Sequence, residues 1–319
     1  MAEVTTEDPL AKAVVEGFSK EPKSVPSWAL YDQKGDQLFR QIMELPEYYL
    51  TDCEAEIFKE SAGEMLRIFS WDVERFNLVE LGAGDGVKTE ILLRQWMEMG
   101  GHLTYIPVDI SPHILDILKE RMRRNIPNLD IHTIPLDFNK ALEGPIQELN
   151  QDRKVFFFLG SNIGNLRREE AVAFLKKVKS KMRKGDMALV GFDLRKDPRV
   201  VQRAYDDSKG ITAEFNLNLL DRLNRELGAD FDKRYFSHYP LYDPVSGTAK
   251  SYIVSRREQE VHFKKLNKKY AFQAWELIHT EISQKFNPTE IKDLASEAGM
   301  EVVNHFQDRK RYYRNVLLM

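Results

Sequence analysis

The sequence predicts an α/β protein with a doubly wound parallel sheet and a second, discontinuous α+β domain. Three observations support this. Strand-like and helix-like segments alternate through the middle of the chain, a glycine-rich turn follows the first of these strands, and both flanks have a different pattern. At about 100–200 residues per domain, 319 residues allow one large domain or two ordinary ones.

The alternating region predicts five strands and three helices. The expected strands are Phe76–Leu81, Tyr105–Ile110, Asp130–Phe138, Val155–Leu159 and Met187–Leu194. The expected helices are Lys88–Met99, one that begins at Ser111-Pro112, and Glu169–Arg183. Ser111 is a good N-cap and Pro112 suits the first helical position. Because Val155–Leu159 is apolar throughout, we expect a central strand covered on both faces.

The flanking segments suggest a second domain. Residues 1–61 are mostly helical in pattern, and the chain is helical again after Pro198. The alternating segments Ala249–Val254 and Glu258–Phe263 suggest an antiparallel hairpin. The last segments read as helix, strand, strand and could return to the edge of the parallel sheet: Thr289–Met300, Glu301–His305 and Arg314–Leu318. We therefore expect one domain over 62–194 and 287–319, and another over 1–61 and 195–286.

Composition excludes several classes of function. Lys+Arg 47 against Asp+Glu 50 gives a net charge of −3, which predicts no nucleic-acid or membrane partner. We expect a cytoplasmic protein, since no apolar run approaches the ~18 residues of a spanning helix and the first residues lack a basic-then-apolar leader. The lone Cys53 excludes a disulfide scaffold and a Cys-based zinc cage, and no two histidines have i, i+3 or i, i+4 spacing, so we expect no metal.

The strongest motif is the turn Leu81-Gly82-Ala83-Gly84-Asp85-Gly86, which follows Glu80. Glycines let a backbone approach a ligand closely. One interpretation is an ordinary tight turn, and a second is a dinucleotide site, although the third glycine of G-x-G-x-x-G comes one residue early here. An acidic residue before G-x-G-x-G is the pattern of S-adenosylmethionine (SAM) methyltransferases, which is the interpretation we favour.

Acidic residues follow the next two predicted strands. Asp109 is placed to accept hydrogen bonds from both hydroxyls of a ribose, or to cap the following helix. The Asp137 carboxylate could accept a hydrogen bond from the amino group of an adenine, while the backbone N–H of Phe138 donates to a nitrogen of the adenine ring. The carboxyl ends of parallel strands form the crevice in which such folds bind ligands. The loop Gly160–Asn165 after the fourth strand lacks the D/N-P-P-F/Y motif of DNA amino-methyltransferases, which argues against nucleobase methylation.

The chain resembles the SAM-dependent histidine Nα-methyltransferases of ergothioneine biosynthesis over roughly residues 10–319. The resemblance rests on LYDQKGDQLFRQIMELPEYYLTDCEAE, LVELGAGDGVKT, YIPVDIS, FLGSNIGNL, DLRKDPRVVQRAYDD, GITAEFNLNLLDRLNRELGADFD and TEISQKF. It implies a Rossmann-like SAM methyltransferase core and a substrate-binding domain. It also implies three successive methyl transfers to the α-amine of L-histidine, giving hercynine. We expect a monomer whose partner is a small-molecule substrate.

The resemblance also assigns site residues. The residues expected to bind SAM are Gly82, Gly84, Lys88, Asp109, Asp137 and Phe138. The residues expected to be catalytic are Asn165, Tyr205 and Tyr31. The residues expected to bind the substrate are Tyr48, Gly160, Asn165, Tyr205, Glu281 and Ser283. The family more often has a threonine where this chain has Asn162.

Two other functions remain open at this point. One is the same chemistry on another, tryptophan-like amino acid, because a related group methylates prenylated tryptophan. The segment Thr280–Ser283 favours histidine, since a carboxylate facing an indole ring would be poorly satisfied. The other is a catalytically idle module that binds SAM or a dinucleotide.

Overall fold

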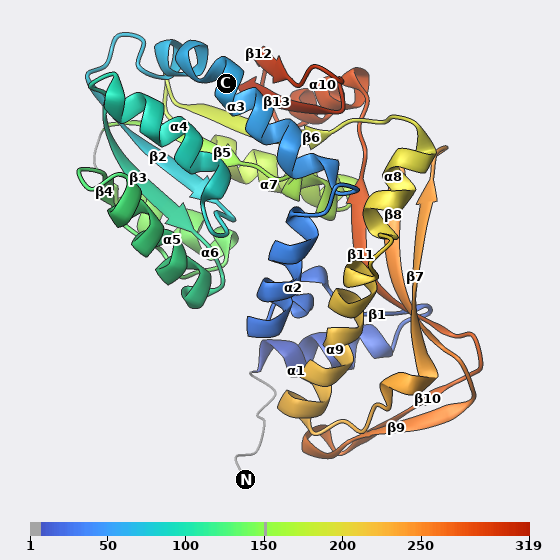
Figure 1. Cartoon of the computed structure of the whole chain (residues 1–319). Helices are drawn as coiled ribbons and strands as arrows, with labels where there is room; N and C mark the ends of the chain where they lie inside the picture. Colours follow the sequence, from blue (N-terminus) through green and yellow to red (C-terminus); the bar gives the residue numbers. More distant parts are fainter. Residues whose placement is uncertain (1–7, 150–151) are drawn as a thin grey trace. The chain divides into compact units, whose positions relative to one another are not determined.

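The computed structural model describes residues 8–149 and 152–319, and the chain divides into two compact units. The first unit contains the chain up to Tyr48 together with Asp197–Ser283, and the second contains Tyr49–Lys196 with Gln284–Met319. Figure 1 shows the elements of both units.

The second unit is a seven-stranded sheet with helices on both faces (Figure 1). Its strands are β2 (Arg75–Leu81), β3 (His102–Val108), β4 (Asp130–Ile131), β5 (Arg153–Phe158), β6 (Met187–Asp193), β12 (Val302–Gln307) and β13 (Tyr313–Leu318). Its helices are α3 (Tyr49–Phe69), α4 (Val87–Glu98), α5 (Pro112–Asn125), α6 (Phe138–Glu143), η2 (Pro145–Glu148), η3 (Asn162–Asn165), α7 (Arg168–Lys181) and α10 (Pro288–Glu297). Helix α3 packs beside α4, whereas α7 packs beside α6 and α10 on the opposite face.

The strand order is β12-β13-β6-β5-β2-β3-β4. Strands β4, β3, β2, β5 and β6 run parallel, while β13 pairs antiparallel with β6 and β12 with β13. This confirms the doubly wound sheet and the return of the C-terminal strands to its edge. The chain builds outward from β2 toward β4 and then resumes at β5 on the other side of β2. The switch point of the sheet therefore lies between β2 and β5, where such folds bind ligands.

The third predicted strand is wrong in length. Only Asp130–Ile131 forms β4, and a single further bridge joins Val108 to Ile134. Pro135 follows that bridge and cannot donate a ladder hydrogen bond, so the strand does not continue. Asp137 instead caps the N-terminus of α6, and its carboxylate accepts the backbone N–H of Asn139 at 2.8 Å.

The first unit combines helices with a four-stranded sheet of order β1-β11-β8-β7 and a separate two-stranded ribbon, β10-β9. Its helices are α1 (Pro9–Phe18), η1 (Ser27–Leu30), α2 (Gln33–Met43), α8 (Pro198–Tyr205), α9 (Ile211–Leu227), η4 (Lys233–Tyr235) and η5 (Lys264–Leu266). Its strands are β1 (Lys23–Ser24), β7 (Phe236–Asp243), β8 (Thr248–Ser255), β9 (Gln259–Phe263), β10 (Lys268–Phe272) and β11 (Leu277–Gln284).

The predicted hairpin between Ala249–Val254 and Glu258–Phe263 is wrong in its pairing. Both segments are strands, but β8 pairs antiparallel with β7, and β9 pairs antiparallel with β10. The carboxylate of Asp243 accepts the N–H of Val245 at 2.9 Å and closes the turn between β7 and β8. Between β9 and β10, Asn267 takes a left-handed conformation (φ 48°), which asparagine tolerates better than most residues.

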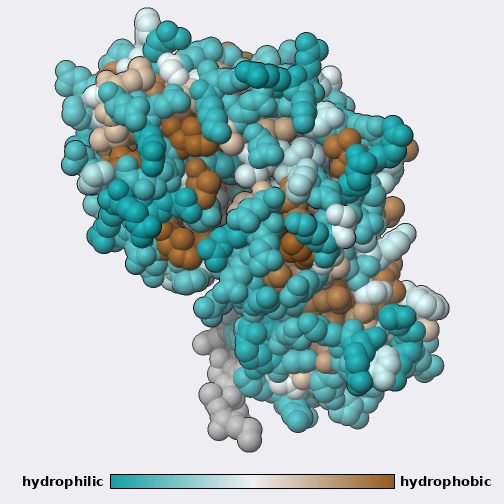
Figure 2. Space-filling model, in the orientation of Figure 1, coloured by the Kyte–Doolittle hydropathy of each residue, from teal (hydrophilic) through white to brown (hydrophobic). Residues whose placement is uncertain are grey.

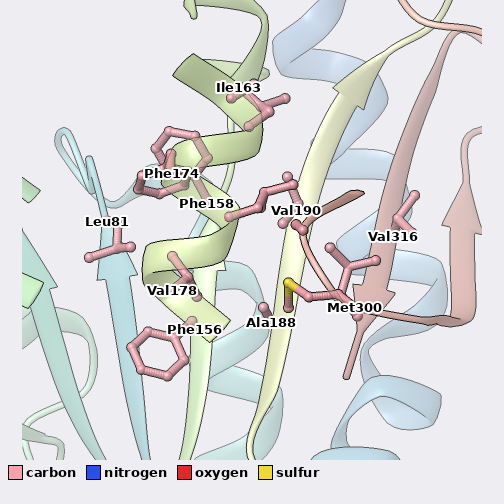
Figure 3. Close-up of a cluster of buried hydrophobic side chains, with 14 of the residues drawn as sticks. Leu81, Phe156, Phe158, Ile163, Phe174, Val178, Ala188, Val190, Met300 and Val316 are labelled. Carbon is pink, nitrogen blue, oxygen red and sulfur yellow. The ribbon is translucent and has the colours of Figure 1, made fainter. Parts of the chain in front are cut away.

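Each unit has its own hydrophobic core. In the second unit one part of the core lies between the sheet and α7, where Phe158 and Phe174 pack at a ring-centroid distance of 4.3 Å (Figure 3), and another lies between the sheet and α3. In the first unit, residues of α1, α2 and α9 pack against the sheet and the ribbon. On the face drawn in Figure 2, hydrophilic residues cover most of the surface, with smaller hydrophobic patches between them. Within 8–149 and 152–319, no helix is long and apolar enough to cross a membrane.

Helix α3 belongs to the second unit, whereas the sequence analysis places the domain boundary at residues 61 and 62. The helix buries Leu50, Cys53 and Ile57 and packs on α4 and β13. The residues of α3 therefore share the core of the sheet rather than that of the preceding helices.

A buried ionic cluster lies where the second unit connects to the first. The chain passes between the units at three places, residues 48–49, 196–197 and 283–284. Beside these places, Tyr49 donates its hydroxyl to the Asp193 carboxylate at 2.8 Å, and Lys285 Nζ lies 2.8 Å from the same carboxylate. Lys196 also pairs with Asp193. One carboxylate, with an exposed fraction of 0%, therefore fixes all three connections on the second unit.

The cluster also sets the ionisation of its carboxyl group. Burial alone would raise the pKa of Asp193, but the ammonium groups of Lys285 and Lys196 outweigh it and hold the pKa below its usual value. The carboxylate is therefore charged in the folded protein, and it compensates two buried cations.

We expect Asp193→Asn to lower the free energy of unfolding by about 3–5 kcal/mol, because it leaves two buried ammonium groups without a counter-charge. Urea denaturation followed by circular dichroism measures this. The control is Asp221→Asn, which breaks the half-exposed pair with Lys233 and should cost about 1 kcal/mol or less. Equal losses in the two variants would contradict a compensating role for Asp193.

Candidate active site

The glycine loop connects β2 to α4 at the switch point. Gly82, Gly84 and Gly86 all have positive φ angles, of 76°, 56° and 69°. A Cβ on Gly86 would lie 2.9 Å from side-chain atoms of Leu118 and Met122, so this glycine is required for packing on α5. A Cβ on Gly84 would meet nothing within 4 Å. The loop is thus fixed at one end and has open space beside Gly84.

Asp109 lies directly beside this space. Its Oδ2 accepts the backbone N–H of Gly84 at 3.0 Å, and its Oδ1 accepts that of Ser111 at 3.0 Å. Burial raises the pKa of Asp109, and these two hydrogen bonds offset part of that effect. Each oxygen has a second lone pair, so the carboxylate can hold the loop and also accept ligand hydroxyls.

The chain that leads to Asp137 and Phe138 passes beside Asp109, because the backbone N–H of Asp109 donates to the carbonyl of Ile134 at 3.3 Å. The ring of Phe138 is half-buried and packs on Phe158 and Phe174, with centroid distances of 5.6 and 5.2 Å. Phe138 therefore packs against the core beside α7, four residues after Ile134, which contacts Asp109.

Glu80 is a buried acid beneath the glycine loop. Its carboxylate accepts the hydroxyl of Thr89 at 2.7 Å and that of Tyr105. Burial raises the pKa of Glu80 to about 7, although both hydrogen bonds act in the opposite direction. The acid that precedes the glycines thus joins β2 to α4 and β3.

The loop after β5 forms the other side of the switch point. Gly160 and Ser161 have positive φ angles of 68° and 59°. A Cβ on Gly164 would lie 2.7 Å from the carbonyl oxygen of Gln284, so the loop backbone approaches that segment closely. The Asn162 side chain would lie 3.0 Å from a Cβ on Gly82. The two loops therefore adjoin, and Asn162 contacts the glycine loop directly.

Lys88 is a basic residue of this region, and its partner was not predicted from the sequence. The Lys88 ammonium pairs with Glu54, a carboxylate of α3 with an exposed fraction of 0%. A signal was present, because Glu54 lies among apolar residues at helical spacing and such a face is buried. Asp193, Lys196 and Lys285 were missed as well.

The aromatic residues assigned to catalysis or substrate binding lie in the first unit. Tyr31 and Tyr48 both pack on Phe39, with ring centroids 5.4 and 6.1 Å apart. Tyr31 also packs on Phe215 at 5.4 Å. Tyr205 is buried at the end of α8. The structure thus brings Tyr31 and Tyr48 into one aromatic cluster.

Glu281 and Ser283 lie on strand β11 of the first unit. Two residues apart, they share one face of the strand, and Ser251 Oγ donates to Glu281 Oε2 at 3.4 Å. Thr280 has the opposite orientation, and its hydroxyl donates to Asn216 at 2.6 Å. Of the assigned substrate residues, Gly160 and Asn165 belong to the second unit and the others to the first.

The described residues offer no cluster of three His, Cys, Asp or Glu side chains that could hold a metal ion. Burial raises the pKa of the Cys53 thiol to about 12, so this thiol is protonated at neutral pH.

A doubly wound sheet with an open glycine loop and an acid at its switch point defines a Rossmann-like enzyme class that binds nucleoside-containing ligands. The family model described as "Histidine-specific methyltransferase, SAM-dependent" matches residues 10–319, and the chain belongs to this family. The resemblance found in the sequence is confirmed.

Three relatives illustrate the range of similarity. A histidine N-alpha-methyltransferase of Mycobacterium tuberculosis is 36% identical over 94% of this chain and 91% of that protein. Ergothioneine biosynthesis protein 1 of Schizosaccharomyces pombe is 28% identical over 89% of this chain and 37% of that protein. An L-tryptophan methyltransferase of Psilocybe serbica is 26% identical over 95% of this chain and 91% of that protein.

Glu80 predicts a specific pH dependence of stability. The pKa of Glu80 is about 7 in the folded protein and 4.5 ordinarily. The protonated carboxyl group therefore contributes to the free energy of unfolding below pH 4.5, and this contribution is lost as the pH rises through 7. Glu80→Gln removes this titration. The variant should therefore gain stability relative to wild type between pH 4.5 and 7, by at most about 3 kcal/mol, and then level off.

Denaturation at a series of pH values measures this difference. Glu98→Gln, at an exposed glutamate of α4, is the control and should follow wild type at every pH. A constant difference between Glu80→Gln and wild type would show that Glu80 does not titrate in this range.

Proposed function

We propose that this chain transfers methyl groups from SAM to the α-amine of L-histidine, three times, to give hercynine for ergothioneine biosynthesis. The observation that carries the proposal is the family match over residues 10–319, together with 36% identity to a histidine N-alpha-methyltransferase. The open space at Gly84 and the adjacent Asp109 carboxylate suit the ribose of the cofactor.

We assign the cofactor to the second unit. Asp109 accepts the ribose hydroxyls while it holds the glycine loop, and the Asp137–Phe138 segment lies at the adenine end. Gly82 and Gly84 let the backbone approach the ligand, and Lys88 provides a positive charge at the other end of the loop. When bound, SAM supplies a methyl group activated by a sulfonium.

We assign recognition of the amino acid as the sequence predicts. Glu281 and Ser283 share a face of β11 and read the imidazole, because the carboxylate accepts its N–H and the hydroxyl donates to its other nitrogen. Asn165 and Tyr205 hold the α-carboxylate and orient the amine, with Gly160 beside Asn165. Tyr31 and Tyr48 contribute the aromatic wall. Position and electrostatics, rather than a covalent intermediate, then supply the catalysis.

Asp109→Ala should weaken SAM binding by at least about tenfold, because it removes charge-assisted hydrogen bonds to the ribose and releases the Gly84 N–H. Titration calorimetry with SAM measures the dissociation constant. Asp116→Ala, at an exposed acid of α5, is the matched control. Wild-type affinity in Asp109→Ala would remove Asp109 from the cofactor site.

Glu281→Ala should lower kcat/KM for histidine by more than about tenfold and narrow the preference for histidine over tryptophan and phenylalanine. The carboxylate attracts the imidazole N–H, and an apolar ring that covers the carboxylate removes water from it without donating a hydrogen bond, which disfavours that ring. Competition among the three amino acids at equal concentration, read by mass spectrometry, measures the ranking.

The control for this experiment is Glu258→Ala, an exposed glutamate between β8 and β9, which should keep the wild-type ranking. If wild-type protein prefers tryptophan, the alternative substrate suggested by the Psilocybe serbica relative replaces histidine. If Glu281→Ala keeps the wild-type preference, Glu281 does not select the substrate.

A further inference from the structure

We propose that Glu54 is a positioning residue for the cofactor site. Its carboxylate places the Lys88 ammonium where it can bind the carboxylate of the methionine part of SAM, and it also holds the backbone of the Gly160 loop. The inference rests on the proposed use of SAM, and it assigns a role to a residue of α3 that lies outside both loops. It follows from three contacts made by one buried side chain.

The first contact is with the cofactor side of the switch point. Glu54 pairs with the ammonium of Lys88, which lies in the first turn of α4 directly after the glycine loop. The Lys88 side chain is 22% exposed, whereas that of Glu54 is 0% exposed. The Lys88 side chain is therefore open to a ligand whereas Glu54 is not, so Glu54 acts on a ligand through Lys88.

The second contact is with the loop after β5. The backbone N–H of Gly160 donates to Glu54 Oε2 at 3.0 Å. A Cβ on Gly160 would lie 3.4 Å from Lys88 Nζ, so the ammonium lies against this glycine. Glu54 thus fixes the ammonium and the Gly160 backbone relative to each other.

The third contact fixes Glu54 itself. The hydroxyl of Tyr313 donates to Glu54 Oε1 at 3.0 Å and accepts the backbone N–H of Ser161 at 2.7 Å. Gly191 of β6 provides the space, because a Cβ there would lie 2.2 Å from the Tyr313 hydroxyl and 2.9 Å from Glu54 Oε1. The carboxylate is therefore held from the side of β13 as well.

The charges explain why a carboxylate is needed. An ammonium has three N–H donors, and Glu54 uses one of them while keeping the nitrogen in place. A ligand carboxylate then meets a cation whose position is already fixed, which reduces the ordering cost of binding. Glutamine at position 54 would keep an oxygen for the Gly160 N–H but would lose the charge that holds Lys88.

The test uses two ligands that differ only in the amino-acid part. S-adenosylhomocysteine has the α-carboxylate, and 5′-methylthioadenosine lacks it. Glu54→Gln should weaken binding of S-adenosylhomocysteine by about tenfold or more, the scale of a charge-assisted contact, and change that of 5′-methylthioadenosine by less than about twofold. Titration calorimetry measures both dissociation constants.

A double-mutant cycle separates positioning from folding. Lys88→Met should lose S-adenosylhomocysteine affinity to a similar extent, and the double variant Glu54→Gln/Lys88→Met should bind no worse than Lys88→Met alone. Equal weakening of both ligands by Glu54→Gln, or additive losses in the double variant, would overturn the proposal. Wild-type affinity for S-adenosylhomocysteine in Glu54→Gln would also overturn it, while methylation of histidine by the wild-type protein would remain a separate result.

Discussion

The arrangement of the switch point depends on the burial of one carboxylate. Glu54 has no access to water, so its charge must be satisfied within the protein. The carboxylate pairs with Lys88 of α4 and accepts hydrogen bonds from the Gly160 backbone, in the loop after β5, and from Tyr313 of β13. Helix α3 is thereby tied to three segments that are distant in sequence, and the glycine loop and the loop after β5 are held in a fixed relation.

Two further buried acids extend this framework below the sheet edge. Glu80 joins β2 to α4 and β3 through the hydroxyls of Thr89 and Tyr105. Asp193, at the end of β6, joins the three points at which the chain leaves the second unit. Burying an acid costs free energy, and its hydrogen bonds and ion pairs offset that cost when every partner is present. These acids therefore hold the joined segments in place more than they raise the net stability of the fold. The proposed methyl transfer depends on holding the reacting groups in place, because correct positioning lowers the barrier of a direct displacement.

The sequence predicted the sheet well, because apolar strands alternating with amphipathic helices have few other solutions. It failed where the pattern does not contain the information. An alternating strand such as Ala249–Val254 does not reveal which strand pairs with it, and Asp130–Phe138 extended the third strand past Pro135.

The loops of the candidate site were predicted from the sequence, whereas the buried residues that hold these loops in place were not. The glycine turn and Asp109 are visible because their residue types are unusual at strand ends. Glu54 looks like an ordinary helix residue until its neighbours at helical spacing are considered, and its partners Lys88, Gly160 and Tyr313 are far away in the sequence. The roles of Tyr205, Glu281 and Asn165 remain predictions that rest on the family resemblance.

The central claim is methylation of the α-nitrogen of histidine, and the most direct measurement is the position and number of the methyl groups in the product. The protein is incubated with SAM and L-histidine, and the product is analysed by fragmentation mass spectrometry. We expect successive products with one, two and three methyl groups, all on the α-nitrogen, and three S-adenosylhomocysteine molecules for each histidine consumed. Methyl groups on the imidazole ring, or no histidine product while tryptophan is methylated, would contradict the account.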